Sequence, residues 1–286
     1  MTNPTRSFQT DFGRFYAHPS FILDAFKAKT ALGSLGREAE IDPTDPYAPK
    51  PSVTNIIGML NKAFLPPYYA KLVAEYAIEN LDNLQETVKK FGPKVAVGTL
   101  KAIPNRPNPA AAIGDEVHNA IDMFVRNEEP DEGQTFSTPT AQNMYLQFLN
   151  FVSQAKPEII RSEYTVWSYK HGYAGTGDLM WKLWGGLWIV DTKTGNQAHP
   201  EVAMQTSALA HADVILDANG NDTPMPQADI QGVLHVRPRS VKLHKLAKTD
   251  EAFEAFLACK RLFDWNRFER EAVLLDPYKT EMTKAA

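Results

Sequence analysis

The chain has 286 residues, of which 43% are hydrophobic, so it is long and apolar enough to bury a large core. Its formal net charge of -4 excludes a generally basic protein that coats nucleic acid through charge alone, although a local basic groove is compatible with that charge. Cys259 is the only cysteine, so this chain by itself offers neither a disulfide nor the ligands of an iron–sulfur cluster. We expect a reducing, cytoplasmic setting, no membrane-spanning run and no signal peptide.

The first 108 residues predict a region of strands and helices that packs on the core. An aromatic run at 12–16 favours a strand or hairpin, and the Pro- and Gly-rich stretch 33–52 favours a long loop. Helical spacing predicts three helices, at 52–63, 69–81 and 84–91. Leu65-Pro66-Pro67 is expected to end the first helix, and the second is expected to have a buried apolar stripe.

Residues 109–286 predict the core itself. Apolar residues repeat at helical or alternating spacing, and the expected elements are helices at 109–127, 140–155, 200–213 and 250–269 and strands at 163–169, 179–184, 187–192, 232–237 and 241–246. This order of helices, a meander of three strands, a helix, two strands and a helix indicates an α+β (α/β-like) fold. A mixed central sheet would be flanked by helices.

The two central strands are joined by Gly185-Gly186, a pair that tolerates positive φ at both positions and therefore predicts a tight hairpin turn. If Trp184 lies opposite Leu187, then Asp178 lies opposite Lys193. Asp191 would then be the diagonal neighbour of Asp178.

Strand alternation gives the hairpin two different faces. One face would carry Asp178, Met180, Asp191 and Lys193, whereas the other would be apolar, with Leu179, Trp181, Leu183, Trp188, Val190 and Thr192. Two carboxylates that converge at one end of an apolar hairpin can share a cation. The alternative is an Asp–Lys pair at a solvated sheet edge.

Four motifs follow one another in the chain: Gly114-x-x-x-His118, Gly175-Thr176-Gly177-Asp178, Ile189-Val190-Asp191-Thr192-Lys193-Thr194-Gly195, and Gln205 on the next predicted helix. Their order and spacing resemble the RecB-type nucleases of the PD-(D/E)XK superfamily. The chain also resembles phage-encoded exonucleases related to the CRISPR-associated RecB-like nucleases. The resemblance implies a restriction-endonuclease-like core.

Two features depart from that family pattern. The family helix often reads Gln-x-x-x-Tyr, but Leu209 occupies the tyrosine position here, so contacts attributed to that tyrosine are in doubt. Several relatives hold an iron–sulfur cluster on four cysteines, which this chain lacks, so we expect no such cluster.

The resemblance implies a Mg²⁺ or Mn²⁺ centre held by Asp178, Asp191 and His118, with the backbone carbonyl of Thr192 as a further ligand. An imidazole ligand favours Mn²⁺ more than a purely oxygen site would. Outside this resemblance, a lone helical histidine such as His118 is more often a packed or exposed side chain.

Three further side chains complete the expected active site. Lys193 would hold the attacking water and stabilise charge on the phosphate, unless it merely forms a salt bridge to Asp178. Gln205 would orient water or a ligand, or else lie on a solvated helix face. Glu163 begins the preceding strand and is an extra ligand, a partner of a ligand, or a surface carboxylate.

Basic and aromatic residues near the predicted cleft suit nucleic acid, and the candidates are Lys170, Tyr173, Arg237, Arg239 and Lys242. For each one, a solvated basic hairpin is the competing interpretation.

The residues and the resemblance together predict a metal-dependent DNA nuclease, a phosphodiesterase. The resemblance implies an exonuclease that acts in phage or bacterial recombination, repair or replication. The alternatives are a catalytically weak nucleic-acid-binding protein on a nuclease-like fold and an RNA-processing nuclease. The expected substrates are single-stranded DNA or duplex ends, with a recombination or single-strand-annealing protein as partner. If the chain is phage-encoded, the compartment is the cytoplasm of the bacterial host.

Overall fold

The structure is a computed structural model that describes residues 7–10, 13–19, 45–60, 65–106, 108–126, 136–217, 219–270 and 273. Most of the predicted loop 33–52 and the end of the predicted helix 52–63 lie outside these residues. Within them, no helix is both long and apolar enough to cross a membrane.

A seven-stranded mixed sheet forms the centre of the molecule, in the order β10-β9-β6-β5-β4-β7-β8. Strands β6 and β9 are parallel, and every other neighbouring pair is antiparallel. The strands are β4 (Glu158–Ser168), β5 (Tyr173–Leu183), β6 (Gly186–Lys193), β7 (Val214–Leu216), β8 (Asp222–Pro224), β9 (Ile230–Arg237) and β10 (Ser240–Lys245). The mixed sheet and the β4–β5–β6 meander are confirmed, whereas β7 and the short, exposed β8 were not predicted from the sequence.

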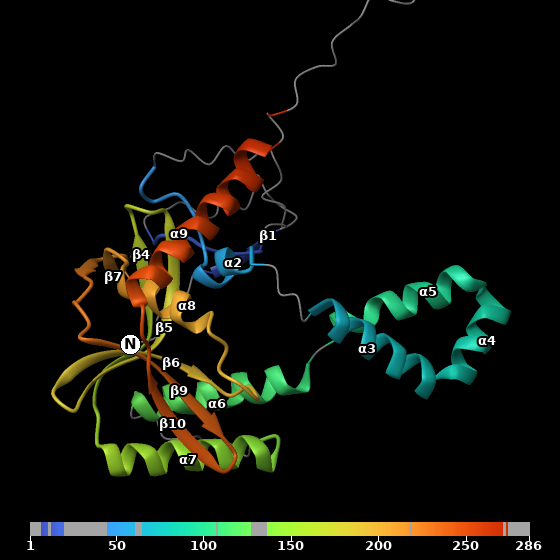
Figure 1. The fold of residues 1–286 in the computed structure, drawn as a ribbon, viewed down its shortest axis with the longest axis horizontal. Helices are drawn as coiled ribbons and strands as arrows, with labels where there is room; N and C mark the ends of the chain where they lie inside the picture. The colour runs from blue at the N-terminus through green and yellow to red at the C-terminus, as the bar shows by residue number, and fades with distance from the viewer. Residues whose placement is uncertain are drawn as a thin grey trace, which may run out of the picture.

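Helices cover both faces of this sheet (Figure 1). On one face lie α6 (Pro109–Val125) and α7 (Pro139–Ala155), and on the other lie α2 (Val53–Ile57), α8 (Val202–Ala210) and α9 (Thr249–Asp264). A turn of π-helix, Trp265–Glu269, extends α9 to the predicted end. The fold is therefore α+β with three layers.

Alternation along the central hairpin sorts its side chains between the two helical layers. Leu179 and Trp181 pack with α6 and α7, whereas Met180 and Ile189 pack with α2, α8 and α9. The predicted division of the hairpin into two faces is thus confirmed.

The predicted register of this hairpin is wrong by two residues. The turn uses Trp184 and Gly185, both at positive φ, and Leu183 pairs with Gly186. The prediction gave the positive-φ positions to the two glycines, but Trp184 adopts that conformation and Gly186 begins β6. Because the shift is an even number, every side chain keeps its face, and continuing the register brings Asp178 opposite Asp191 instead of Lys193.

A small three-stranded sheet precedes the core and consists of β1 (Ser7–Thr10), β2 (Gly13–Tyr16) and β3 (Lys50–Pro51). A parallel bridge from Ser52 to Ala174 joins this segment to β5. The hydroxyl of Ser52 accepts a hydrogen bond from the backbone N–H of Asn55, so Ser52 is the N-cap of α2, as the sequence suggested.

Residues 65–106 form a helical arm that Figure 1 shows to the side of the sheet. It contains α3 (Leu65–Glu79), α4 (Leu81–Phe91), α5 (Pro93–Ala102) and a 3₁₀ turn, Ile103–Asn105. The predicted break at Leu65-Pro66-Pro67 is instead the first turn of α3, where proline removes no helical hydrogen bond. The predicted stripe of this helix, Leu72, Val73, Tyr76 and Ala77, is its less exposed face, but these side chains are only half-buried and α3 has no buried residue. Helix α5 was not predicted.

Candidate metal centre

Three acidic residues lie side by side on three neighbouring strands. The pairs Ser162–Leu179 and Tyr164–Gly177 bring Glu163 of β4 level with Asp178 of β5. The β5–β6 register brings Asp191 of β6 to the other side of Asp178. The sheet therefore assembles a row of carboxylates from three consecutive strands.

Histidine 118 reaches this row from α6, and Gly114 explains how the helix comes so close. A Cβ atom at Gly114 would lie 2.8 Å from Oγ1 of Thr194, just after β6, so a side chain there would hold α6 away from the strand end. One helical turn later, Nδ1 of His118 lies 3.6 Å from Oδ2 of Asp178. The Gly-x-x-x-His spacing thus has a packing reason.

Asp178 is held in position by the neighbouring strand. Its Oδ2 accepts a hydrogen bond of 2.7 Å from the backbone N–H of Thr192. A bond from a backbone donor orients the carboxylate without the freedom that a side-chain donor would have.

Glu163 lies at a local distortion of β4. Its φ of 42° is in the left-handed region, which is uncommon for a residue with a side chain and typical of functional sites. Burial, followed by the charges of Asp178 and Asp122, raises the pKa of Glu163 from 4.5 to about 8. Without a cation, this carboxyl group therefore tends to keep its proton near neutral pH.

Asp191 and Lys193 form a close ion pair at the inner end of the site. Asp191 is buried, and its Oδ2 lies 2.7 Å from Nζ of Lys193, which also donates a 3.3 Å hydrogen bond to Oε1 of Gln205. Burial and the charge of Asp178 raise the pKa of Asp191, although Lys193 opposes them. Burial disfavours the charge of Lys193, but Asp191 and Asp178 outweigh it and raise the pKa of Lys193, so the lysine remains an ammonium.

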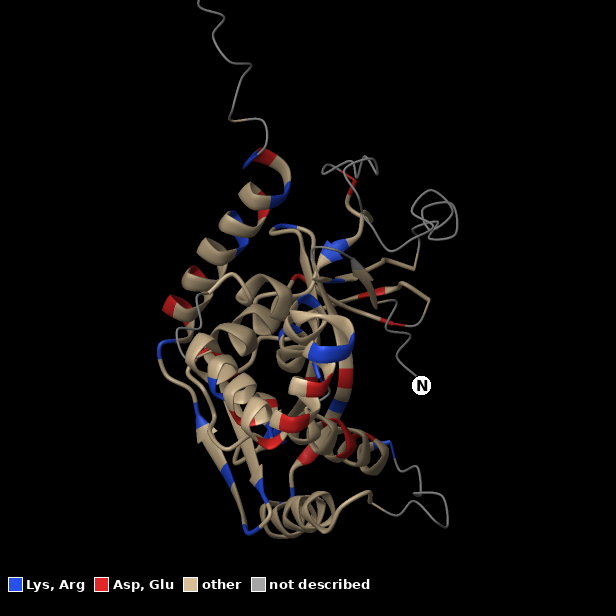
Figure 2. Ribbon diagram, turned by 90° about the vertical axis from the view of Figure 1, so that its right-hand side faces the viewer, with Lys and Arg blue, Asp and Glu red and all other residues tan. Residues whose placement is uncertain are grey.

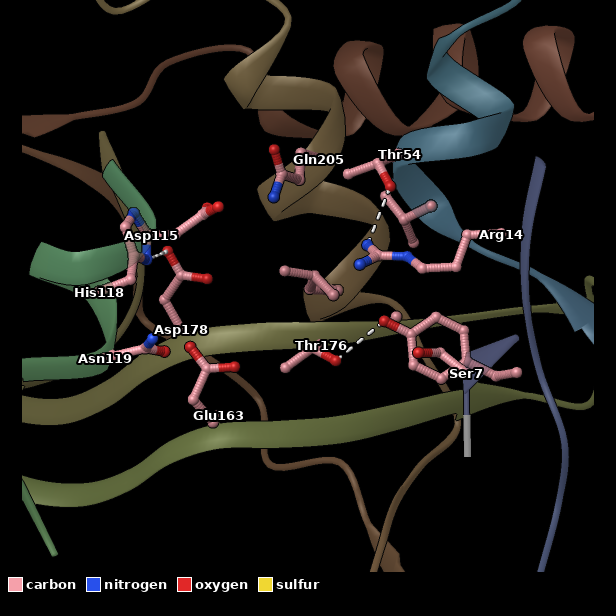
Figure 3. Close-up of a pocket in the computed structure, with 14 residues that line it drawn as sticks. Ser7, Arg14, Thr54, Asp115, His118, Asn119, Glu163, Thr176, Asp178 and Gln205 are labelled. Atoms are coloured by element: carbon pink, nitrogen blue, oxygen red, sulfur yellow. Dashed lines mark hydrogen bonds and ion pairs between the residues drawn. The ribbon is translucent and has the colours of Figure 1, made fainter. Parts of the chain in front are cut away.

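His118, Glu163, Asp178 and Gln205 line a cleft of about 560 Å³ (Figure 3). In the figure, His118, Asp178 and Glu163 gather at one end with Asp115 and Asn119, and Gln205 projects from α8 above them. The opposite end carries Arg14, which donates to Oγ1 of Thr54 at 3.2 Å, and Thr176, whose hydroxyl lies 2.9 Å from that of Tyr16. The cleft is acidic at one end and has a guanidinium at the other.

The acidic end fits a divalent cation. His118, Glu163 and Asp178 each offer one atom, and these atoms lie within 4.8 Å of one another. Ligand atoms about 2.1 Å from a shared Mg²⁺ can be at most roughly 4.2 Å apart, so a small contraction would complete the site. Two carboxylates and one imidazole match the ligand preferences of Mn²⁺ as well as those of Mg²⁺.

Asp191 and Thr192, the other two predicted ligands, lie beside the group of His118, Glu163 and Asp178 and not within it. Asp191 faces Lys193, but within the described residues its Oδ1 has no hydrogen-bond partner, so it retains a lone pair for a ligand beside Asp178. Thr192 is buried and contributes its backbone N–H to Asp178.

The residues predicted to bind nucleic acid separate into two groups. The prediction that Tyr173 contacts nucleic acid is wrong, because its side chain is fully buried between α8 and α9. Its hydroxyl donates a 2.7 Å hydrogen bond to the carbonyl of Ala208. Arg237 is part-buried and binds the loop after β6, through the carbonyl of Thr194 (2.7 Å) and Oδ1 of Asn196 (2.8 Å). In contrast, Lys170, Arg239 and Lys242 are exposed. Figure 2 shows basic and acidic residues interspersed over the described fold.

Several residues of the cleft were not found from the sequence. Asp115 and Asn119 lie on α6 at positions −3 and +1 from His118, so helical spacing around the histidine was a usable signal. Arg14 gave no local signal, because β2 reaches the cleft only through tertiary packing. Tyr164 is buried beside the acidic residues, and within the described residues its hydroxyl has no hydrogen-bond partner.

A scan against models of known protein families found no match to this chain, and a search of curated proteins found no similar sequence either.

Proposed function

We propose that this protein is a metal-dependent DNA nuclease, with exonuclease activity as the principal mode. The observation that carries the proposal is the gathering of His118, Glu163 and Asp178 at one end of an open cleft, with the buried Asp191–Lys193 ion pair beside Asp178. Phosphodiester hydrolysis needs charge relief on the phosphate and an activated water, and this set of groups supplies both requirements.

His118, Glu163 and Asp178 would hold the cation, with Asp191 available beside them. When bound, Mg²⁺ or Mn²⁺ supplies Lewis-acid stabilisation of the phosphate and lowers the pKa of a bound water. Because Lys193 keeps its proton, it acts by donating hydrogen bonds to the water and to the phosphate oxygens, and not as a general base. Gln205 orients the ammonium of Lys193 through its Oε1.

The proposal includes a PD-(D/E)XK core of the RecB type. It is supported by the order of the four motifs and by the adjacency of their acidic residues on β5 and β6, next to a helix that carries Gln205. Cytoplasmic DNA ends as substrate, and a recombination or annealing protein as partner, belong to the same proposal and rest on the resemblance alone.

The test is digestion of end-labelled linear DNA, closed circular DNA and RNA of the same sequence, with Mg²⁺, Mn²⁺ or EDTA. We expect cleavage of linear DNA in both metals, loss of cleavage in EDTA, and little nicking of the closed circle. Cleavage that persists after exhaustive chelation would contradict the metal centre, and rapid nicking of circles would contradict the exonuclease mode.

Two variants link the activity to the cluster. Asp178→Asn and His118→Gln should each lower cleavage by about a hundredfold or more, because each removes a ligand. The matched control is His244→Gln, which changes an exposed histidine on β10. Equal activity of all three variants would show that another site cleaves the DNA, and RNA cleaved faster than DNA would favour the RNA-processing alternative.

A further inference from the structure

The helical arm, residues 65–106, exposes more apolar surface than a free-standing unit of its size should. Within the described residues, eight of the 16 exposed large hydrophobic side chains are in the arm, and they are Tyr68, Tyr69, Ile78, Leu81, Val88, Phe91, Val95 and Val97. Only Ala96 and Ile103 of the arm are buried. A unit of about 40 residues cannot be stabilised by so small a core, so this surface is expected to be covered.

The most regular part of this surface is a stripe along α4. Leu81, Leu84, Val88 and Phe91 follow one another at spacings of three, four and three residues, which places them on one helix face. Leu81, Val88 and Phe91 are 56%, 42% and 68% exposed, respectively. A stripe with two heptad-like steps that no described residue covers is typical of one half of a helix pair.

The spacing of the stripe reads the same in both directions. An antiparallel copy of α4 would therefore present the same stripe, with Leu81 opposite Phe91 of the second copy and Leu84 opposite its Val88. Such self-complementarity is the requirement for an interface across a two-fold axis.

The charges of α4 favour the same arrangement. Asp82 lies in its first turn, and Lys89 and Lys90 lie in its last turn. Lys90 pairs with Glu86 of its own helix at 2.6 Å, whereas within the described residues no ion pair is recorded for Asp82 or Lys89. Antiparallel pairing places the acidic end of each α4 beside the basic end of the other and also opposes the two helix dipoles. Parallel pairing would bring like charges together.

We propose that α4 forms an antiparallel contact with α4 of a second copy of this chain, so that the protein is a two-fold symmetric dimer through its helical arm. A stable interface buries about 800 Å² per partner, which exceeds what one short helix offers. The patch therefore includes Ile78, which is 78% exposed at the end of α3, and Val95 at the start of α5. Nucleic acid is a poorer match, because the stripe offers neither cations nor a stacking platform along most of its length.

The first test is sedimentation equilibrium of the full chain in EDTA, which separates this inference from the nuclease proposal. We expect a dimer whose dissociation constant rises by at least about thirtyfold in Leu81→Asp and in Phe91→Asp, because each places a carboxylate against an apolar side chain of the partner. The matched control is Leu262→Asp on α9, which is 53% exposed and should leave the dimer intact. A monomer at every concentration, or a dimer that survives both arm substitutions, would overturn the proposal.

The second test reads the orientation of the helices. Chains with Leu81→Cys and chains with Phe91→Cys are prepared separately and treated with a short thiol cross-linker; the native Cys259 is buried. In the antiparallel arrangement, two copies of residue 91 are about 15 Å apart along the axis, whereas residue 91 lies beside residue 81 of the partner. We expect cross-linked dimers only when the two variants are mixed. Efficient cross-linking within each variant alone would indicate parallel helices and refute the arrangement.

Discussion

The raised pKa of Glu163 predicts a specific dependence of stability on pH in the absence of metal. The carboxyl group titrates near its ordinary value of 4.5 when the chain is unfolded and at about 8 when it is folded. Between these two values, the folded state keeps a proton that the unfolded state has lost. The free energy of unfolding should therefore fall as the pH rises from about 5 to 8 and level off above that.

The size of this effect follows from the two pKa values. Their separation corresponds to at most roughly 5 kcal/mol, at 1.36 kcal/mol for each step of one in pKa. Glu163 borders an open cleft, where water screens its charge, so we expect about half of that limit, or 2–3 kcal/mol. Asp191 contributes a loss in the same direction, so the effect of Glu163 must be measured as a difference between proteins.

The assay is urea denaturation in EDTA at pH 5, 6, 7 and 8 for the wild type and Glu163→Gln. The amide cannot ionise, so the variant should lose about 2–3 kcal/mol less than the wild type over this range. Glu158→Gln is the control, because Glu158 is an exposed carboxylate on the same strand and should follow the wild-type curve. With Mn²⁺ present, the wild type should lose its excess slope, since a cation favours the ionised form. Parallel curves for wild type and Glu163→Gln in EDTA would refute this account of the site.

Three further predictions concern the residues around the site. Asp191→Ala should weaken both Mn²⁺ affinity and cleavage, whereas Lys193→Ala should keep or tighten Mn²⁺ binding and lower cleavage about a hundredfold. Calorimetric titration measures the affinity and single-turnover kinetics measure the cleavage. A fully active Lys193→Ala would contradict the role given to the ammonium. Tyr173→Phe should lower the free energy of unfolding, measured by urea denaturation, by about 1 kcal/mol, because the buried Ala208 carbonyl loses its donor. The variant should bind DNA as tightly as the wild type, and weaker binding by the folded variant would restore Tyr173 as a contact residue. Gly177→Ala should destabilise the protein by about 2–3 kcal/mol, because its Cβ would lie 2.3 Å from the ring of Tyr164, and a melting temperature equal to that of the wild type would show that this approach is not constrained.

Sequence reasoning placed side chains correctly where the pattern was local. The alternation of the hairpin sorted its side chains correctly, and the helical Gly114–His118 spacing brought the histidine to Asp178. The register was wrong because Trp184, and not Gly186, takes positive φ beside Gly185. The preference of glycine for positive φ is not strong enough to decide which of these two residues lies in the turn. The error of two residues did not change the face on which each side chain lies, but the predicted register missed that Asp178 and Asp191 are direct cross-strand neighbours.

The parts that sequence reasoning missed depend on tertiary contacts. Arg14 and Thr54 reach the cleft from the N-terminal sheet and α2, which are far from the motifs in the chain. The distortion at Glu163 has no signature in a strand that otherwise alternates normally. The stripe assumed to be buried on α3 shows that helical periodicity indicates an apolar face but does not say what covers it.

The parallel pairing of β6 with β9 has a consequence for how the protein folds. Strands β4, β5 and β6 form from consecutive hairpins, whereas β9 joins β6 only after the chain has passed through α8, β7 and β8. Contacts between residues so far apart in sequence form slowly, because a long loop must close first. In the final register, Val233 of β9 lies beside Asp191 and helps to bury it. We therefore expect that the carboxylates meet early in a hydrated meander, and that docking of β9 is the late step that withdraws Asp191 from water.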